Sequence, residues 1–263
     1  MPQFRLAVAT RCFRQPIAAS LKTASELHVQ GVQFDLGHEV TSSGLTESGR
    51  RQFLHRLSEL NLSVAGAVFP LTHPLTDPRE LERRVTAVRD AMTFAYALKA
   101  STLCCRVGRI PPDRDSKERL LLVEILNDLA RHGNHVGTVL CITPTDDSAV
   151  ELTALVSEIK TGPLGIDFDP AHFAMTGRSS VEALRTLHAV VSHVQLRDGL
   201  RDFSGGSQEA AVGRGTIDWP EVFALLSEMD YRGWVTAVRT QGDDRPGDIV
   251  RAVQYLRELL PGV

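Results

Sequence analysis

The chain has 263 residues, of which 43% are hydrophobic and 23% charged, and its formal net charge is −3. These values are typical of an ordinary globular protein, and they exclude a bulk electrostatic field that would recruit nucleic acid or an anionic membrane. A length near 250 residues is common for a single α/β barrel and is sufficient to bury a large core.

The N-terminal sequence MPQFRLAVATRCF enters a strand-like run directly, without the basic and apolar segments of a secretory leader. Glu124 interrupts the apolar run LLLVEIL, and no stretch approaches the roughly 18 apolar residues of a membrane span. The cysteines form no CxxC pair, so we expect reduced, mostly buried thiols in a cytoplasmic protein. They are Cys12, Cys104, Cys105 and Cys141.

Short apolar runs bounded by Gly, Pro or Asp predict β-strands at intervals along the whole chain. Their near-continuous apolarity favours strands covered on both faces, as in a parallel sheet. In chain order they are RLAVATRCF, GVQFDLG, LSVAGAVF, STLCCRVG, GTVLCIT, LGIDFDP, VSHVQLRD and GWVTAVRT.

Longer amphipathic segments separate these runs and predict helices. Residues 78–98 place apolar side chains at helical spacing. A second helix is predicted from the N-cap residue Ser116 to Gly133, a typical C-terminal stop. Asp218 and Glu221 resemble a capping box with Pro220 in the first turn, and a final helix is predicted from about 248 to 260.

This alternation, without a linker or a low-complexity tract, predicts an α/β protein with a single (β/α)8 TIM barrel domain over residues 1–263. A doubly wound open sheet is the alternative. The sequence ATRCFRQP after the first strand lacks the glycine fingerprint that such sheets use to bind phosphate, which counts against the alternative.

In TIM barrels, ligands bind at the carboxyl ends of the strands. Any one polar residue there is more readily structural than catalytic, but convergence of several at one mouth predicts a ligand site. The predicted strand ends supply Arg11, Asp35, His38, Arg106, Thr143, Asp167, Asp169, His172, Gln195, Arg197, Asp198 and Arg239.

A family resemblance rests on motifs in conserved order along the chain. GIDFDPAHF, HVQLRD, GRGTIDW and YRGWVTAVRT resemble the second half of the xylose-isomerase-like barrels, and ERRVTAVRDAMTFAYALKAS followed by VGRIPPD resembles their third helix and fourth strand. This superfamily contains sugar phosphate isomerases and epimerases, inosose dehydratases and AP endonucleases of the endonuclease IV type. The resemblance implies the fold more specifically than the substrate.

The resemblance also implies a divalent cation at the barrel mouth, bound by Glu, Asp, His and Glu from strands 5, 6, 7 and 8. The cation stabilises an enediolate, and the two Glu residues relay the proton. Asp169 matches the family Asp, and His172 matches a family His that contacts substrate. The other positions depart from the pattern, because Thr143, Gln195 and Val238 replace Glu, His and Glu.

Valine offers no lone pair, and Thr and Gln are weak neutral donors, so we expect no family-type metal and no other cofactor. Weak binding of Mn or Mg remains open. Asp169 and His172 are the candidate catalytic residues. The candidate substrate-binding residues are Asp35, Arg106, Gln195, Arg197 and Arg239.

Arginine suits a carboxylate or phosphate ligand, because it donates two parallel hydrogen bonds. The alternative, compatible with the first, is that these arginines neutralise acids at the mouth. Arg109 and Arg214 lie in adjoining loops, and strict strand alternation would turn Arg239 toward the helix layer. We interpret His193 as a hydrogen-bonded barrel histidine, and the glycine-rich residues 202–215 as a loop that is either a lid or ordinary surface.

The sequence therefore predicts a sugar (phosphate) isomerase/epimerase-like protein with a degenerate metal site, which binds a small sugar-like, polyhydroxylated or anionic ligand. An active metal-dependent isomerase with altered ligands is the alternative. An endonuclease IV-like repair protein is least favoured, since the His and Glu cluster for three zincs and a basic surface are missing. We expect no nucleic-acid or membrane partner, and a homo-oligomer is left open.

Overall fold

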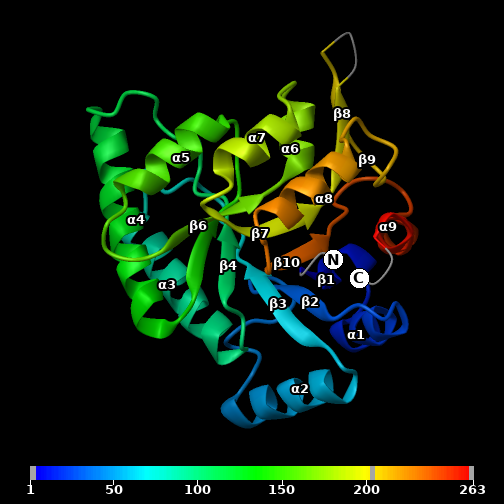
Figure 1. Cartoon of the computed structure of the whole chain (residues 1–263). Helices are drawn as coiled ribbons and strands as arrows, with labels where there is room; N and C mark the ends of the chain where they lie inside the picture. The colour runs from blue at the N-terminus through cyan, green and yellow to red at the C-terminus, as the bar shows by residue number, and fades with distance from the viewer. Residues whose placement is uncertain (1–3, 202–204, 261–263) are drawn as a thin grey trace.

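The computed structural model describes residues 4–201 and 205–260, and its central feature is a closed barrel of parallel strands (Figure 1). The barrel closes where β1 pairs with the last strand, with Leu6 opposite Val235. This closure confirms the TIM barrel and rules out the open doubly wound sheet. In chain order the barrel strands are β1 (Arg5–Ala9), β2 (Gly31–Asp35), β3 (Ser63–Val68), β4 (Thr102–Cys105), β5 (Val139–Ile142), β6 (Leu164–Phe168), β7 (Val191–Leu196) and β10 (Trp234–Ala237).

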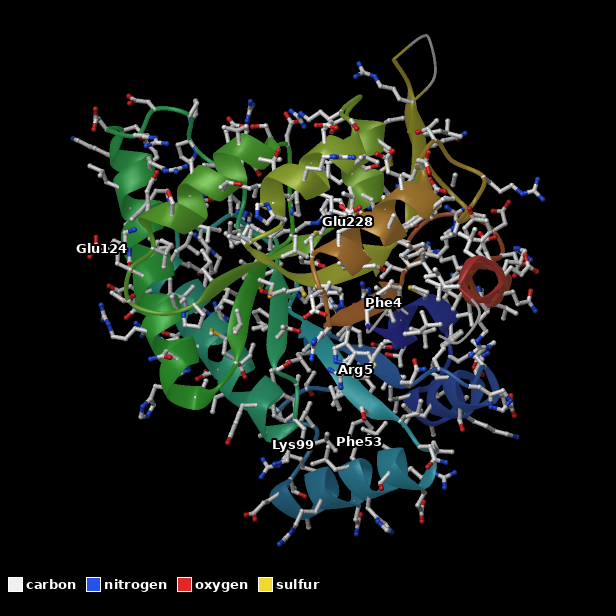
Figure 2. All side chains as sticks on the ribbon, viewed as in Figure 1. Phe4, Arg5, Phe53, Lys99, Glu124 and Glu228 are labelled. Atoms are coloured by element: carbon white, nitrogen blue, oxygen red, sulfur yellow. The ribbon has the colours of Figure 1, made fainter. Side chains whose placement is uncertain are left out.

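Helices surround the barrel and cover its outer face (Figure 1). Their polar side chains point outward, as Glu124 does from α4 (Figure 2). In chain order the helices are η1 (Thr10–Phe13), α1 (Ile17–Glu26), α2 (Glu47–Glu59), α3 (Leu81–Ala97), α4 (Lys117–Val136), α5 (Ala149–Glu158), α6 (Pro170–Met175), α7 (Ser180–Leu187), α8 (Trp219–Glu228) and α9 (Arg245–Leu259).

The helix boundaries follow local sequence signals, with two corrections. Ser116 caps α4 as predicted, by accepting from the backbone N–H of Arg119. Gly133 does not end this helix, which continues to Val136 and stops at Gly137 with φ 90°. A Cβ at Gly133 would lie 2.4 Å from the carbonyl oxygen of Thr138. Glycine at this position therefore allows the backbone after the helix to pass close to it. The final helix begins at Arg245, three residues earlier than predicted.

The segment after β7 is another correction, because it is not a simple loop. β8 (Asp198–Arg201) and β9 (Ser207–Ala210) form an antiparallel hairpin, with Asp198 opposite Ala210. Residues 202–204 of the predicted glycine-rich loop lie outside the described residues. The Asp198 carboxylate accepts from Gly213 N–H and from Trp219 Nε1, so it fixes the hairpin base to α8 rather than facing the mouth.

The interior of the barrel changes from apolar at its amino-terminal end to polar at its mouth. Trp234 packs with Ala7 and Ala65 at the amino-terminal end, as a small cluster separate from the main core between strands and helices. The four cysteines are buried and unpaired, as predicted. Among the described helices none is long and apolar enough to cross a membrane.

Candidate functional site

A buried hydrogen-bond network fills the barrel below its mouth, centred on Asp167 of β6. Asp167 Oδ1 lies 2.7 Å from Nδ1 of His193 on β7. Its other oxygen, Oδ2, accepts from Thr143 Oγ1 at 2.7 Å and from Gln195 Nε2 at 2.6 Å. His193 and Gln195 both reach Asp167 because they are two residues apart on β7, and side chains at that spacing share one face of a strand. Thr143 and Gln195 are thus both hydrogen-bonded to Asp167.

The Asp167–His193 pair is ionised at neutral pH. Burial raises the pKa of Asp167, but the charge and hydrogen bond of His193, with those of Thr143 and Gln195, outweigh it and hold this pKa below its usual value. Burial lowers the pKa of His193, but Cys104 and Asp167 outweigh it and raise this pKa to about 10. His193 Nε2 lies 2.8 Å from Thr236 Oγ1, so both ring nitrogens have partners. His193 is therefore a hydrogen-bonded barrel histidine, as the sequence predicted.

One cluster within residues 4–201 and 205–260 brings His, Cys and acid side chains close enough for a shared metal ion. It consists of Cys104, Asp167 and His193, whose ligand atoms lie within 4.8 Å of one another. A hydrogen bond with Cys141, together with burial, raises the pKa of Cys104 well above its usual value. Metals bind the thiolate, whereas this sulfur stays protonated beside an already bonded Asp–His pair. The cluster therefore belongs to the polar core.

Arg197, just after β7, lies between two buried carboxylates. Its Nη1 donates to Asp169 Oδ2 at 2.6 Å, and its Nη2 donates to Glu209 Oε2 at 3.2 Å. Burial lowers the pKa of Arg197, but Asp169 and Glu209 outweigh it and raise this pKa. Glu209 comes from β9 and also accepts the backbone N–H groups of Thr240 and Gln241 after β10. The hairpin therefore supplies a carboxylate that ties two strand ends together.

His172 lies on the first turn of α6, next to Asp169 of this ion pair. The turn is capped by Asp169, whose side chain accepts from the His172 N–H. Burial lowers the pKa of His172, with help from the charges of Arg106, Arg178 and Arg197 and against that of Asp169. The ring is consequently neutral at pH 7. Its Nε2 is buried without a hydrogen-bond partner in the described part of the chain.

A cavity of about 420 Å³ opens at the carboxyl ends of the strands, above the Asp167 network. Its wall carries the guanidinium groups of Arg11, Arg106 and Arg197, and Asp35 is its one acid. Arg11 donates to Gln33, whereas Arg106 has neither a hydrogen bond nor an ion pair with any described residue. The other wall residues are Val68, Phe69, Pro70, Leu71, Cys104, Thr143, Gln195, Val238, Thr240 and Gln241.

The structure brings most of the predicted site residues together. Asp35, Arg106, Gln195 and Arg197 line this cavity, while Asp169 and His172 lie outside its wall next to Arg197. Asp35 is held by the N–H groups of Gly37 and His38.

Arg239 lies outside the cavity wall as well. Its Nε donates to Asp248 of α9 at 2.8 Å, as strand alternation indicates, and its Nη1 lies 3.8 Å from Oε1 of Glu209, so its guanidinium joins the helix layer to the hairpin. Arg109 and Arg214 are also absent from the wall.

Sequence reasoning did not find Glu209, Thr240 or Gln33. Glu209 is an isolated acid in a segment of small residues, and its side chain is 0% exposed. Nothing in its sequence neighbourhood marks it as a partner of the arginines that follow β7 and β10. Thr240 and Gln241 come directly after Arg239, so the search of strand ends reached their neighbour and stopped one residue early.

The chain belongs to the xylose isomerase-like TIM barrel family, whose model matches residues 21–259. The L-ribulose 3-epimerase of Methylomonas sp. (strain DH-1) is 23% identical over 172 residues, which are 61% of this chain and 57% of that protein. The inosose dehydratase of Clostridium botulinum (strain Eklund 17B / Type B) is 25% identical over 142 residues, 48% of this chain and 46% of that protein. The matches thus span about half the length of these curated relatives.

A solved structure extends the likeness over the whole fold. The xylose isomerase domain protein from Planctomyces limnophilus superposes with a TM-score of 0.84 at 22% identity, covering 99% of this chain and 97% of that one. Similarity at this level of identity establishes the shared barrel and leaves substrate and chemistry to be argued from the site.

Proposed function

We propose that this sugar isomerase/epimerase-like protein binds a small, polyhydroxylated and anionic ligand in its mouth cavity, without the divalent cation of its family. The observation that carries the proposal is the charge of the wall, where Arg11 and Arg106 border a space of about 420 Å³ with Asp35 as the acid of the wall, while Arg197 is already paired with Asp169 and Glu209. Because Arg106 has no partner among the described residues, its hydrogen-bond donors are available to a carboxylate or phosphate.

The residues at the family metal positions do not fit a hard divalent ion. Asp169 is engaged by Arg197 at 2.6 Å, so a guanidinium already supplies its counter-charge. Thr143 and Gln195 both donate toward Asp167, and Val238 has no donor atom. Hard cations prefer several carboxylate and carbonyl oxygens, and this set offers few that are free. No step of the proposed function therefore uses a metal.

Neutral polar groups in the wall suit a ligand that carries hydroxyl groups. Gln195 donates from its Nε2 to Asp167. Its Oε1 has no partner among the described residues, so this oxygen is free to accept a hydrogen bond from a ligand hydroxyl. The hydroxyl of Thr143 donates to Asp167 and keeps a lone pair for the same purpose. Gln195 lies on β7, whereas Thr143 and Arg106 each follow a strand end by one residue, so one ligand in the cavity could contact all three.

His172 and Asp169 remain the candidate catalytic residues. The neutral ring of His172, with its unpartnered Nε2, is in the right state to accept a proton at pH 7. Asp169 is fixed by Arg197 and by the α6 turn, which assigns it the task of positioning the ring. The two carboxylates that relay the proton in metal-dependent relatives have no counterpart at Thr143 and Val238.

Thermal denaturation with a ligand panel, together with elemental analysis, tests this function. Glucuronate and glucose 6-phosphate should raise the melting temperature, glucose should do so much less, and Mn²⁺ should leave it unchanged. Arg106→Gln should weaken binding of the two anions about 10- to 100-fold, the range for a lost charged hydrogen bond. Arg109→Gln, an exposed arginine of the same loop that does not line the cavity, is the matched control.

The same experiment exposes the alternative, an active metal-dependent isomerase. Stoichiometric metal in the purified protein, with EDTA-sensitive epimerisation of a keto-sugar, would overturn the metal-free proposal. Equal responses to glucose and glucuronate would remove the role assigned to Arg106.

A further inference from the structure

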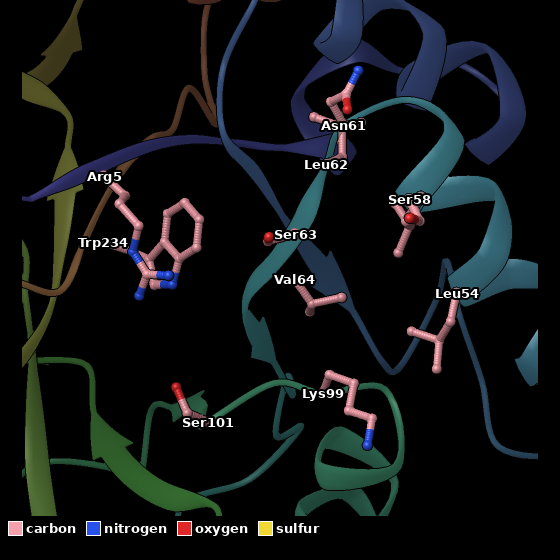
Figure 3. Close-up of a pocket in the computed structure, with 11 residues that line it drawn as sticks. Arg5, Leu54, Ser58, Asn61, Leu62, Ser63, Val64, Lys99, Ser101 and Trp234 are labelled. Atoms are coloured by element: carbon pink, nitrogen blue, oxygen red, sulfur yellow. The ribbon is translucent and has the colours of Figure 1, made fainter. Parts of the chain in front are cut away.

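A second cavity, of about 690 Å³, lies at the opposite end of the barrel from the mouth (Figure 3). Arg5, Ser63 and Trp234 in its wall are the first residues of β1, β3 and β10, whereas the mouth residues follow strand ends. Helix α2 forms one side through Leu54, Leu57 and Ser58. The remaining wall residues are Asn61, Leu62, Val64, Lys99 and Ser101.

The two cavities are separated by the indole of Trp234, which closes the barrel from below. The ring is 5% exposed and packs with Ala7 and Ala65 inside the strands. Gly31 allows this position, because a Cβ there would lie 2.7 Å from the indole. A ligand in the lower cavity would therefore not be in contact with the Asp167 network, so this inference stands apart from the proposed function.

The wall of the lower cavity carries positive charge and no carboxylate. Arg5 and Lys99 are its ionised residues, in a chain that has 32 acidic and 29 basic residues overall. The Arg5 guanidinium lies 4.0 Å from the centre of the Trp234 ring, which holds it in place without neutralising it. Lys99 has no ion pair with any residue in the described ranges. Both cations are thus available, on opposite sides of one concave space (Figure 3).

The other groups of the wall divide it into a polar and an apolar part. The hydroxyls of Ser63 and Ser101 lie on the Arg5 side of the wall (Figure 3) and can donate to an oxyanion. Leu54, Leu62 and Val64 form an apolar side toward α2. A bare phosphate would fill only a small part of such a space. The ligand chemistry that matches the wall is an oxyanion joined to an apolar body.

We propose that the cavity formed by Arg5, Trp234, Lys99 and α2 is a second ligand site, which binds a small molecule with a phosphate or carboxylate group and an apolar portion. Arg5 and the serine hydroxyls hold the oxyanion, and the apolar portion contacts α2 and β3. A ligand held between α2 and the strand starts would also join a peripheral helix to the barrel.

Titration of the ¹⁵N-labelled full chain with phenyl phosphate tests the proposal. The indole N–H signal of Trp234, assigned with Trp234→Phe, should shift with saturation, while that of Trp219 at the other end should not. Arg5→Gln should weaken binding about tenfold or more, the effect of losing a charged hydrogen bond, whereas Lys99→Gln, on the opposite side of the wall, should weaken it less. Arg106→Gln, which alters the mouth, and Lys117→Gln, an exposed lysine on α4, should bind as the parent does.

Inorganic phosphate and phenol separate the two parts of the ligand. Phosphate should bind more weakly than phenyl phosphate at the same residues, and phenol should bind weakly and independently of Arg5. The proposal fails if Trp234 does not respond, if Lys117→Gln weakens binding as much as Arg5→Gln, or if the Arg5 variant, with an unchanged melting temperature, binds normally.

Discussion

At the scale of single residues, the buried pair of Asp167 and His193 couples stability to pH. The pKa of His193 is raised to about 10 in the folded chain, against 6.5 for an ordinary histidine. A group whose pKa is higher in the folded state binds its proton more tightly there. Its contribution to stability is therefore complete below pH 6.5 and declines as the pH rises toward 10.

We expect the free energy of unfolding to fall steadily between pH 6.5 and 8.5, and urea denaturation at several pH values measures it. Asp167→Asn removes the carboxylate that stabilises the charged ring, so this variant should be destabilised by several kcal/mol at pH 6 and should lose most of the slope. Asp243→Asn, at an exposed position, should keep the parent's slope. A parent protein whose stability is flat across this window would contradict the ionised pair.

Ligands bind at the carboxyl ends of barrel strands, and this rule explains which residues of the site could be predicted from the sequence. Gln195 and Arg197 were placed correctly because the carboxyl ends of parallel strands converge at one mouth whatever their side chains are. The hydrogen-bond partner of Gln195 could not be predicted, since its pairing with Asp167 rather than Asp169 depends on depth in the barrel and not on sequence spacing. Arg239 shows the opposite limit, because alternation alone turned it toward α9 and Asp248.

At the scale of elements, the β8–β9 hairpin is built into the mouth through Glu209. This carboxylate receives N–H groups from Thr240 and Gln241 and a guanidinium donor from Arg197. The sequence of the segment, rich in Gly, Ser and Ala, predicted a loop because it carries no alternating apolar pattern. The hairpin forms since its ends are fixed by buried polar contacts, which periodicity does not detect.

Replacing Glu209 by Gln should loosen this attachment. The amide presents an NH₂ group to donors that require acceptors, so we expect a loss of about 1–3 kcal/mol in the free energy of unfolding. Hydrogen exchange should accelerate in Asp198–Arg201 and Ser207–Ala210 before the barrel strands are affected. Glu228→Gln, at an exposed position on α8 (Figure 2), should change neither quantity. Unchanged exchange in the hairpin of Glu209→Gln would show that the attachment does not depend on this charge.

At the scale of the whole molecule, eight strands that close on themselves leave no edge, so the barrel opens as a unit or not at all. The cysteines report on this property because they are all buried, with Cys104, Cys105 and Cys141 on the paired strands β4 and β5 and Cys12 on η1. Burial raises the pKa of Cys12 and Cys105, and hydrogen bonding to Cys141 does so for Cys104, which keeps these sulfurs as unreactive thiols.

We therefore expect Ellman's reagent to modify none of the thiols in the native chain on a scale of minutes and all four after unfolding in guanidinium. At intermediate denaturant the four should react with one common rate, which tracks the population of the unfolded state. Cys104 tests whether the mouth opens separately from the rest of the barrel, because it borders the mouth cavity although it is 0% exposed. If Cys104→Ser removes a fast phase and leaves the others unchanged, the mouth opens locally. If it removes a quarter of the amplitude at the same rate, the barrel behaves as one cooperative unit, which the closed sheet predicts.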